Sequence, residues 1–168
     1  VNPADGEVES DLVDHQTTTV SVDSATTQIP DEHFDQFEFG PDASDSSTQL
    51  LVPRSTAERD SIREYPLYLY YPIENTRDVS LPFCLHGHFT VETNRKDLSL
   101  NSLDENRAVL EDGVELVANV AEAMAGSGLR NQYPWVLLPP PIDESVDDPS
   151  SQASLLSWFR ASVYEELR

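Results

Sequence analysis

Lysine is almost absent from this chain. Its 168 residues include ten basic side chains, of which only Lys96 is a lysine, against 31 Asp or Glu, so the formal net charge is -21. Carboxylates hold water and cations, and concentrated salt screens their mutual repulsion. Acidity combined with lysine scarcity predicts an extreme halophile, and specifically an archaeon, as the source. The same charge argues against nucleic acid and against a membrane surface as partners.

Cysteine and long apolar runs are also lacking. Cys84 is the only cysteine, which excludes a disulfide within the chain and a zinc knuckle of paired cysteines. Its place in an apolar stretch indicates a packing group and not a reactive thiol. No G-x-S-x-G nucleophile motif occurs. No run of about 18 apolar residues and no leader-like segment is found, so we expect a cytoplasmic protein.

Large apolar side chains are rare in the first part of the chain. Residues 1–47 are crowded with Asp, Glu, Ser and Thr, and such a composition buries too little surface to offset backbone entropy. We therefore expect this acidic segment to be largely disordered and to precede a domain over 48–168. Two exceptions stand out: a β-branched run at 17–22 that predicts a strand, and three phenylalanines within 34–39 that suit docking onto a partner.

From residue 48 onward the hydrophobic pattern predicts an α+β domain. Strands are expected near 48–53, 66–72, 81–92 and 135–138, forming a small, mostly antiparallel sheet. The polar turn between the second and third of these strands has the length of a hairpin connection. This spacing predicts that they pair antiparallel with each other.

Two helices are expected on one face of this sheet. The first, over 103–125, has a capping box made by Ser102 and Glu105, and its apolar side chains recur every three or four residues. The second, over 149–167, begins after Asp148 and Pro149, a pair typical of helix starts.

The basic pair Arg95-Lys96 follows the apolar stretch at 81–91 directly, within an otherwise acidic protein. Arg95 is expected at the rim of the core, where its planar fork of donors can reach a phosphate or a carboxylate. The simpler alternative is a local ion pair between Arg95 and Asp97 or another nearby acid.

The order of several motifs resembles a known family. These motifs are YYPIENT at 70–76, LPF at 81–83 followed by Phe89 and Arg95, and a helix start at Asn106 with Leu110. Together they resemble the segment that follows the ATP-binding fold in sacsin-like members of the GHKL superfamily, which also contains the large heat-shock chaperone, DNA gyrase B and histidine kinases. The resemblance covers about residues 50–124, less than half of the chain.

The resemblance implies that Arg95 senses the γ-phosphate of ATP held by another domain, with Asn94 and Lys96 supporting its loop. The superfamily's own ATP-binding motifs, a D-x-G-x-G turn and a Gly-rich lid among them, are not found here. We therefore expect no hydrolysis by this chain alone and no cofactor bound by it alone. ATP and Mg²⁺ would enter only with a missing or separately encoded ATP-binding domain. The chain would then be a fragment, a split-gene product or a remnant of such an ATPase.

Two other functions are open at this point. The chain could be a non-catalytic acidic adaptor that binds a protein partner through a sheet edge or its Pro-rich segment. It could also be a small metallohydrolase, since His86 and His88 have the H-x-H spacing that points two imidazoles to one side of a strand. Asp78 or Asp97 would then add oxygen ligands, although ordinary strand positions explain the two histidines equally well.

Overall fold

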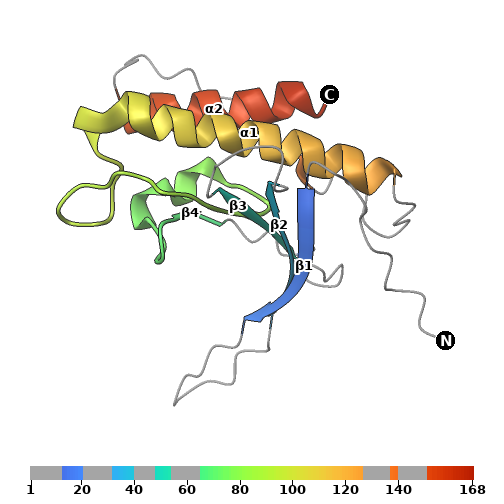
Figure 1. Cartoon of the computed structure of the whole chain (residues 1–168). Coiled ribbons are helices and arrows are strands. Elements are labelled where there is room, and N and C mark those ends of the chain that lie inside the picture. Colours follow the sequence, from blue (N-terminus) through green and yellow to red (C-terminus); the bar gives the residue numbers. More distant parts are fainter. Residues whose placement is uncertain (1–12, 21–31, 40–47, 54–64, 127–136, 140–150) are drawn as a thin grey trace.

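The computed structural model describes residues 13–20, 32–39, 48–53, 65–126, 137–139 and 151–168. A mixed sheet forms one layer, and two helices lie together on one side of it (Figure 1). This arrangement confirms the predicted α+β class. Within the described residues, no helix is both long and apolar enough to span a bilayer.

Five strands make up the sheet, in the order β1-β2-β3-β5-β4. Their bounds are β1 Val13–Val20, β2 Glu32–Phe39, β3 Gln49–Pro53, β4 Leu67–Tyr68 and β5 Cys84–His86. All neighbouring pairs are antiparallel except β4 and β5, which run parallel. The prediction of a mostly antiparallel sheet is therefore confirmed.

The predicted antiparallel pairing of 66–72 with 81–92 is wrong. The chain reverses immediately after β4, at Tyr70, and then passes through the 3-10 helix η1, Glu74–Val79, before it enters β5. This extra reversal makes β5 run in the same direction as β4, and β5 pairs antiparallel with β3 instead.

Both of these strands are also shorter than predicted. β5 ends at His86 because the chain leaves the sheet at Gly87, whose N–H still donates to the carbonyl of Tyr68 over 3.0 Å. A Cβ atom at position 87 would lie 2.5 Å from Cγ1 of Val109 on the first helix. A larger residue at this position would force the Val109 side chain to shift.

The predicted strand near 135–138 lies mostly outside the described residues. Within 137–139, Leu137 is buried in the core and belongs to no strand.

The sheet begins earlier in the chain than the hydrophobic pattern predicts. β1 covers 13–20, which overlaps the predicted strand at 17–22, and β2 follows at 32–39. Phe34, Phe37 and Phe39 on β2 are all buried within this chain. The expectation that these phenylalanines dock onto a partner is therefore wrong, because β2 already packs beside β3 and beneath the first helix.

Both predicted helices are confirmed: α1 spans Leu103–Gly126 and α2 spans Gln152–Glu166. α1 contacts β1, β2 and β3, whereas α2 contacts α1 and η1. Ser102 belongs to a short 3-10 helix, η2 (Leu100–Ser102), which runs directly into α1. The extended residue that precedes η2 is Ser99. The cap of α2 is Ser151, whose side chain accepts a hydrogen bond from the N–H of Ser154 over 3.1 Å. Asp148 and Pro149 lie outside the described residues.

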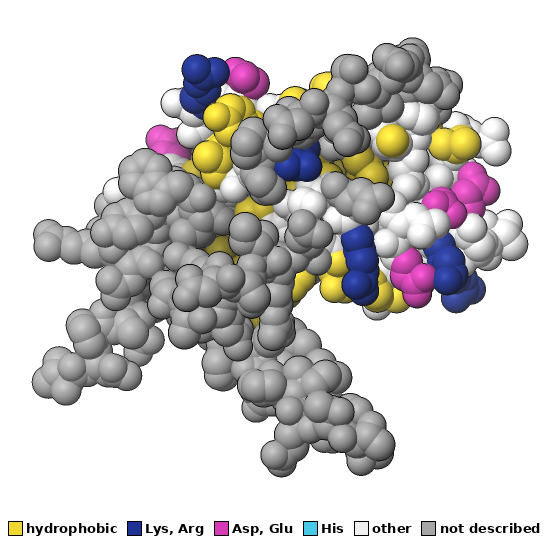
Figure 2. All heavy atoms as spheres, turned by 180° about the vertical axis from the view of Figure 1, so that it is seen from behind, with side chains coloured by type: hydrophobic (Ala, Val, Ile, Leu, Met, Phe, Trp, Pro, Cys, Tyr) yellow, Lys and Arg dark blue, Asp and Glu magenta, His cyan; other side chains and the backbone are white. Residues whose placement is uncertain are grey.

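One hydrophobic core fills the space between the sheet and the helices. Its largest fully buried side chains include Phe37, Leu50, Leu85, Leu110 and Phe159. On the face seen in Figure 2, basic side chains lie beside acidic ones at the edges of the described part. Because this core joins the sheet to both helices, the two layers form a packed support for the loops at the β4 end.

Candidate functional site

Arg95 lies in a loop that begins at Val91 and ends at Leu98, two residues that form a bridge at its base. We call this segment the Arg95 loop. Next to the bridge, the N–H of Glu92 donates to the carbonyl of Asp97 over 2.9 Å, and the N–H of Arg95 donates to the carbonyl of Glu92 over 2.8 Å. The loop projects, in yellow-green, near the start of α1 (Figure 1). Its own backbone hydrogen bonds thus fix its shape.

Asp97 is the centre of a side-chain network inside this loop. Its Oδ1 accepts from Nδ2 of Asn75 over 2.7 Å, and its Oδ2 accepts from Nδ2 of Asn94 over 2.8 Å. Asn94 Oδ1 accepts in turn from the N–H of Lys96 over 2.8 Å. The hydrogen bonds from Asn75 and then Asn94 hold the pKa of Asp97 below its ordinary value. Both carboxylate oxygens are therefore engaged by amides and not by Arg95.

Lys96 ties the loop to η1. Its Nζ lies 2.7 Å from Oε2 of Glu74, with both side chains about half exposed. This contact lowers the pKa of Glu74 and raises the pKa of Lys96. The local ion pair that the sequence suggested for the arginine is made by the neighbouring lysine instead.

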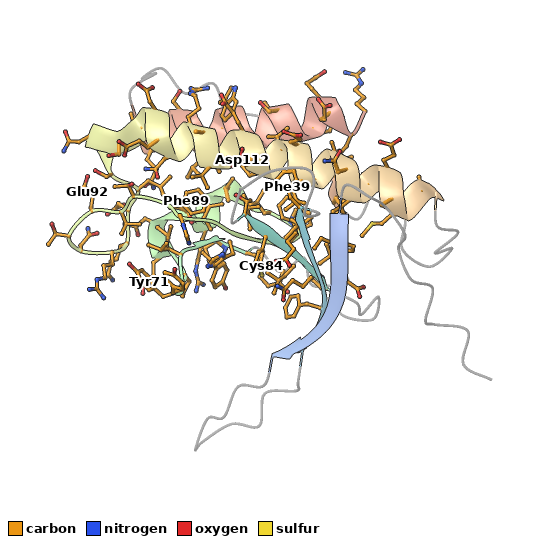
Figure 3. All side chains as sticks on the ribbon, viewed as in Figure 1. Phe39, Tyr71, Cys84, Phe89, Glu92 and Asp112 are labelled. Atoms are coloured by element: carbon orange, nitrogen blue, oxygen red, sulfur yellow. The ribbon has the colours of Figure 1, made fainter. Side chains whose placement is uncertain are left out.

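Arg95 stands apart from this network. Its side chain is exposed, and its guanidinium carbon lies 5.8 Å from the centre of the Tyr71 ring. Among the residues that the structure describes, no carboxylate lies within ion-pair distance of it. Figure 3 labels Tyr71 and Glu92, which lie on opposite sides of this end of the molecule. The backbone at Arg95 has φ 59°, an uncommon value for a residue with a side chain.

Two amide side chains fasten the ends of the loop to the helices. On α1, Oδ1 of buried Asn106 accepts from the N–H of Thr90 over 2.8 Å, and its Nδ2 donates to the Thr90 carbonyl over 2.9 Å. On α2, Oε1 of Gln152 accepts from the N–H of Leu98 over 2.6 Å, and its Nε2 donates to the carbonyl of Asn75 over 3.1 Å. The loop is therefore held between both helices and η1.

Sequence reasoning singled out Asn94, Arg95, Lys96 and Asp97, and the structure brings these residues together in one loop. It missed Asn75 and Gln152, which are 22 residues from the Asp97 carboxylate and 54 residues from the Leu98 N–H that they respectively bind. Their only sequence signal is an amide side chain beside a turn or a helix start, a signal shared by many surface residues.

The second sequence candidate, His86 and His88, lies beside Tyr70. The Tyr70 ring contacts both imidazoles, with ring centres 5.6 and 6.2 Å apart. Asp97 belongs to the Arg95 loop network, and the side chain of Asp78 lies outside the described residues. In the described part of the chain, no group of three or more His, Cys, Asp or Glu side chains is placed to hold a metal ion.

Cys84 lies two residues before His86 on β5 and is buried. Burial raises the pKa of its thiol to about 12. It is therefore a neutral packing group, with no thiolate available for nucleophilic chemistry or for metal binding.

No family model, no curated protein and no solved structure matches this chain. The functional conclusion therefore rests on the residues of the Arg95 loop and on the motifs in the sequence.

Proposed function

We propose that this domain supplies a phosphate-sensing arginine to an ATP-binding domain that lies elsewhere, either in the same protein or in a partner chain. Arg95 contacts the γ-phosphate in this proposal, and Asn94 and Lys96 hold its loop. The observation that carries the proposal is the exposed guanidinium of Arg95, which has no carboxylate partner among the described residues and is mounted on a loop whose other polar groups are paired.

The contact with Tyr71 supports this role. A guanidinium that lies over an aromatic ring uses its face, so the N–H groups on its edge remain available for a planar, two-oxygen contact with a phosphate. The ring also limits the orientations that the side chain adopts. Less conformational entropy is then lost when a phosphate binds.

Charge also supports the proposal. In a chain with net charge -21, a triphosphate meets repulsion over most of the surface. Arg95 and Lys96 are adjacent cations, and Lys96 is already neutralised by Glu74. Arg95 is therefore the group in this loop with an uncompensated positive charge to offer an anion.

The nucleotide itself must be held by other residues. The sequence has no D-x-G-x-G turn, and its six glycines form no phosphate-binding loop. This chain therefore contributes one cation to the reaction and not the pocket. It resembles in this respect an arginine finger, which stabilises charge on the transferred phosphoryl group from outside the nucleotide site.

The test is ATP turnover by the assembled protein, in which this chain is joined to or mixed with its ATP-binding domain in concentrated KCl. Arg95→Ala is expected to lower the turnover rate about a thousandfold or more, as loss of an arginine finger does. Arg77→Ala is the matched control, because Arg77 is also exposed, lies in η1 and is placed outside the loop. Equal rates for the Arg95→Ala and Arg77→Ala proteins would contradict the proposal.

A further inference from the structure

The segment from Leu67 to Ile73 forms an unusually tight hairpin. The N–H of Ile73 donates to the carbonyl of Leu67 over 2.9 Å, and Leu69 and Tyr71 exchange two backbone hydrogen bonds of 3.0 Å each. Tyr70 is thus the only residue in the turn, with φ 64°. Such a γ-turn with positive φ is rare and strained, and a tyrosine there has a steric cost that a glycine would not have.

Burial in the core does not explain a tyrosine at this position, because the residue is 80 % exposed and its ring contacts only His86 and His88 among the described aromatic rings. Strain of this kind persists where the surrounding structure enforces it, and it is found preferentially at functional sites. The hairpin therefore displays Tyr70 outward, at the surface beside the end of β5.

His88 is displayed beside it in a similar way. The N–H of Phe89 donates to the carbonyl of Gly87 over 2.9 Å, so His88 is the central residue of a second three-residue turn. Its side chain is exposed, and its Nε2 lies 3.4 Å from the hydroxyl of Tyr70. Two separate turns, 18 residues apart in the chain, thus bring a phenol and an imidazole together.

His86 completes the group. The Tyr70 ring packs edge-on against its imidazole, and Nδ1 of His86 is buried without any hydrogen-bond partner. A buried nitrogen without a partner costs free energy, and an unaccounted ligand commonly explains one. Burial and then the neighbouring His88 lower the pKa of His86.

We propose that His86, His88 and Tyr70 form a binding site for a divalent transition-metal ion of the Zn²⁺ class. His86, the last residue of β5, and His88, in the turn that follows it, provide the nitrogen ligands; the Tyr70 hydroxyl, 3.4 Å from Nε2 of His88, provides an oxygen, and water fills the remaining positions. Imidazole nitrogen selects Zn²⁺, Cu²⁺ or Ni²⁺ over Mg²⁺ and Ca²⁺, which prefer carboxylate and carbonyl oxygen. The site is independent of the proposed phosphate-sensing function.

The acidic surface makes the choice of control decisive. Thirty-one carboxylates also attract divalent cations, but they attract Mg²⁺ as well as Zn²⁺, and concentrated salt screens them. We therefore propose calorimetric titration of the full chain with Zn²⁺ in concentrated KCl, repeated with Mg²⁺. The expected result is one Zn²⁺ per chain that a large excess of Mg²⁺ does not displace.

Single substitutions then assign the site. His86→Ala and His88→Ala are each expected to weaken Zn²⁺ binding more than about tenfold, with a smaller loss for Tyr70→Phe. The matched controls are His15→Ala and His33→Ala, which remove the two other histidines of the chain and should leave binding unchanged. Arg95→Ala should also bind Zn²⁺ normally, which separates this site from the phosphate-sensing loop.

Two results would overturn the proposal: no Zn²⁺ binding by the folded wild-type chain, or equal binding by the wild-type and His88→Ala proteins. His88 is exposed, so its replacement leaves the core intact. Its variant is decisive even if His86→Ala fails to fold.

Discussion

The Arg95 loop and the Tyr70 hairpin are built in opposite ways, although each places an exposed side chain at a residue with positive φ. In the Arg95 loop, the amides and the Asp97 carboxylate satisfy one another, and only the guanidinium is left without an ionic partner. Beside the hairpin, a buried nitrogen of His86 lacks any hydrogen bond. A satisfied network holds one charged group on a rigid loop, whereas an unsatisfied buried nitrogen requires a physical explanation, for which we propose a bound metal ion.

The largest expected effect on the free energy of unfolding comes from removing the hydrogen bonds that attach the Arg95 loop to α1. Asn106→Ala empties a fully buried side-chain position and removes two hydrogen bonds to the backbone of Thr90; the Thr90 N–H loses its partner, whereas the Thr90 carbonyl keeps its hydrogen bond from the N–H of Ser99. We expect a loss of about 3 kcal/mol in the free energy of unfolding. Chemical denaturation in concentrated KCl measures it.

Asn101→Ala is the control for this experiment, because Asn101 is an exposed asparagine only five positions away. It should change the free energy of unfolding by less than about 0.5 kcal/mol. If both variants lose the same stability, Asn106 does not anchor the loop.

A smaller effect of opposite sign is expected at the hairpin. Tyr70→Gly places at φ 64° the one residue that adopts positive φ without steric cost, and the exposed ring contributes little packing. We expect the protein to become about 1 kcal/mol more stable. Thermal denaturation of this variant, beside Tyr71→Gly as a control that should lose stability, checks the prediction.

A destabilised Tyr70→Gly protein would mean that the hairpin is not strained. A second measurement on the same variant compares its Zn²⁺ affinity with that of the wild-type protein, and we expect the stabilised variant to bind Zn²⁺ less tightly. The strain at Tyr70 would then be maintained for binding and not for folding.

The smallest expected effect is a pH dependence within the Arg95 loop. The folded-state pKa of Asp97 lies below its ordinary value of 3.8. Its contribution to stability is therefore complete above that ordinary value, and it is lost as the pH falls through the folded-state pKa. Since the group is solvent-exposed, the contribution is less than about 1 kcal/mol.

The difference in unfolding free energy between the wild-type and Asp97→Asn proteins, measured from neutral pH downward, isolates this term from the many other carboxylates. It should shrink on acidification. A difference that stays constant with pH would show that the charge of Asp97 plays no part in bracing the loop.

Helix α1 could be predicted from the sequence, whereas the pairing and the lengths of β4 and β5 could not. Leu110, Val117 and Met124 recur at helical spacing, so α1 was predicted nearly to the residue. The parallel pairing of β4 was missed because Tyr70 occupies a turn that normally requires glycine, and no local composition marks a tyrosine as a reversal. Period-two patterning also continued through Phe89 and Val91, although the chain leaves the sheet at Gly87.

In the candidate site, likewise, some residues could be predicted from the sequence and others could not. Arg95 was found because a basic pair interrupts an acidic chain, and charge is visible in a sequence. Asn75 and Gln152 were missed because their contacts with the loop depend on how η1 and α2 pack. Such amide bridges between distant segments leave no periodic or local signal.

The central claim is that Arg95 contacts a γ-phosphate, and the nitrogen-15 NMR signal of its side-chain Nε–H tests this contact most directly. The account predicts that this signal shifts when the ATP-binding domain is added with a non-hydrolysable ATP analogue, and not when it is added with ADP. An equal shift with both nucleotides, or no shift with either, would contradict it.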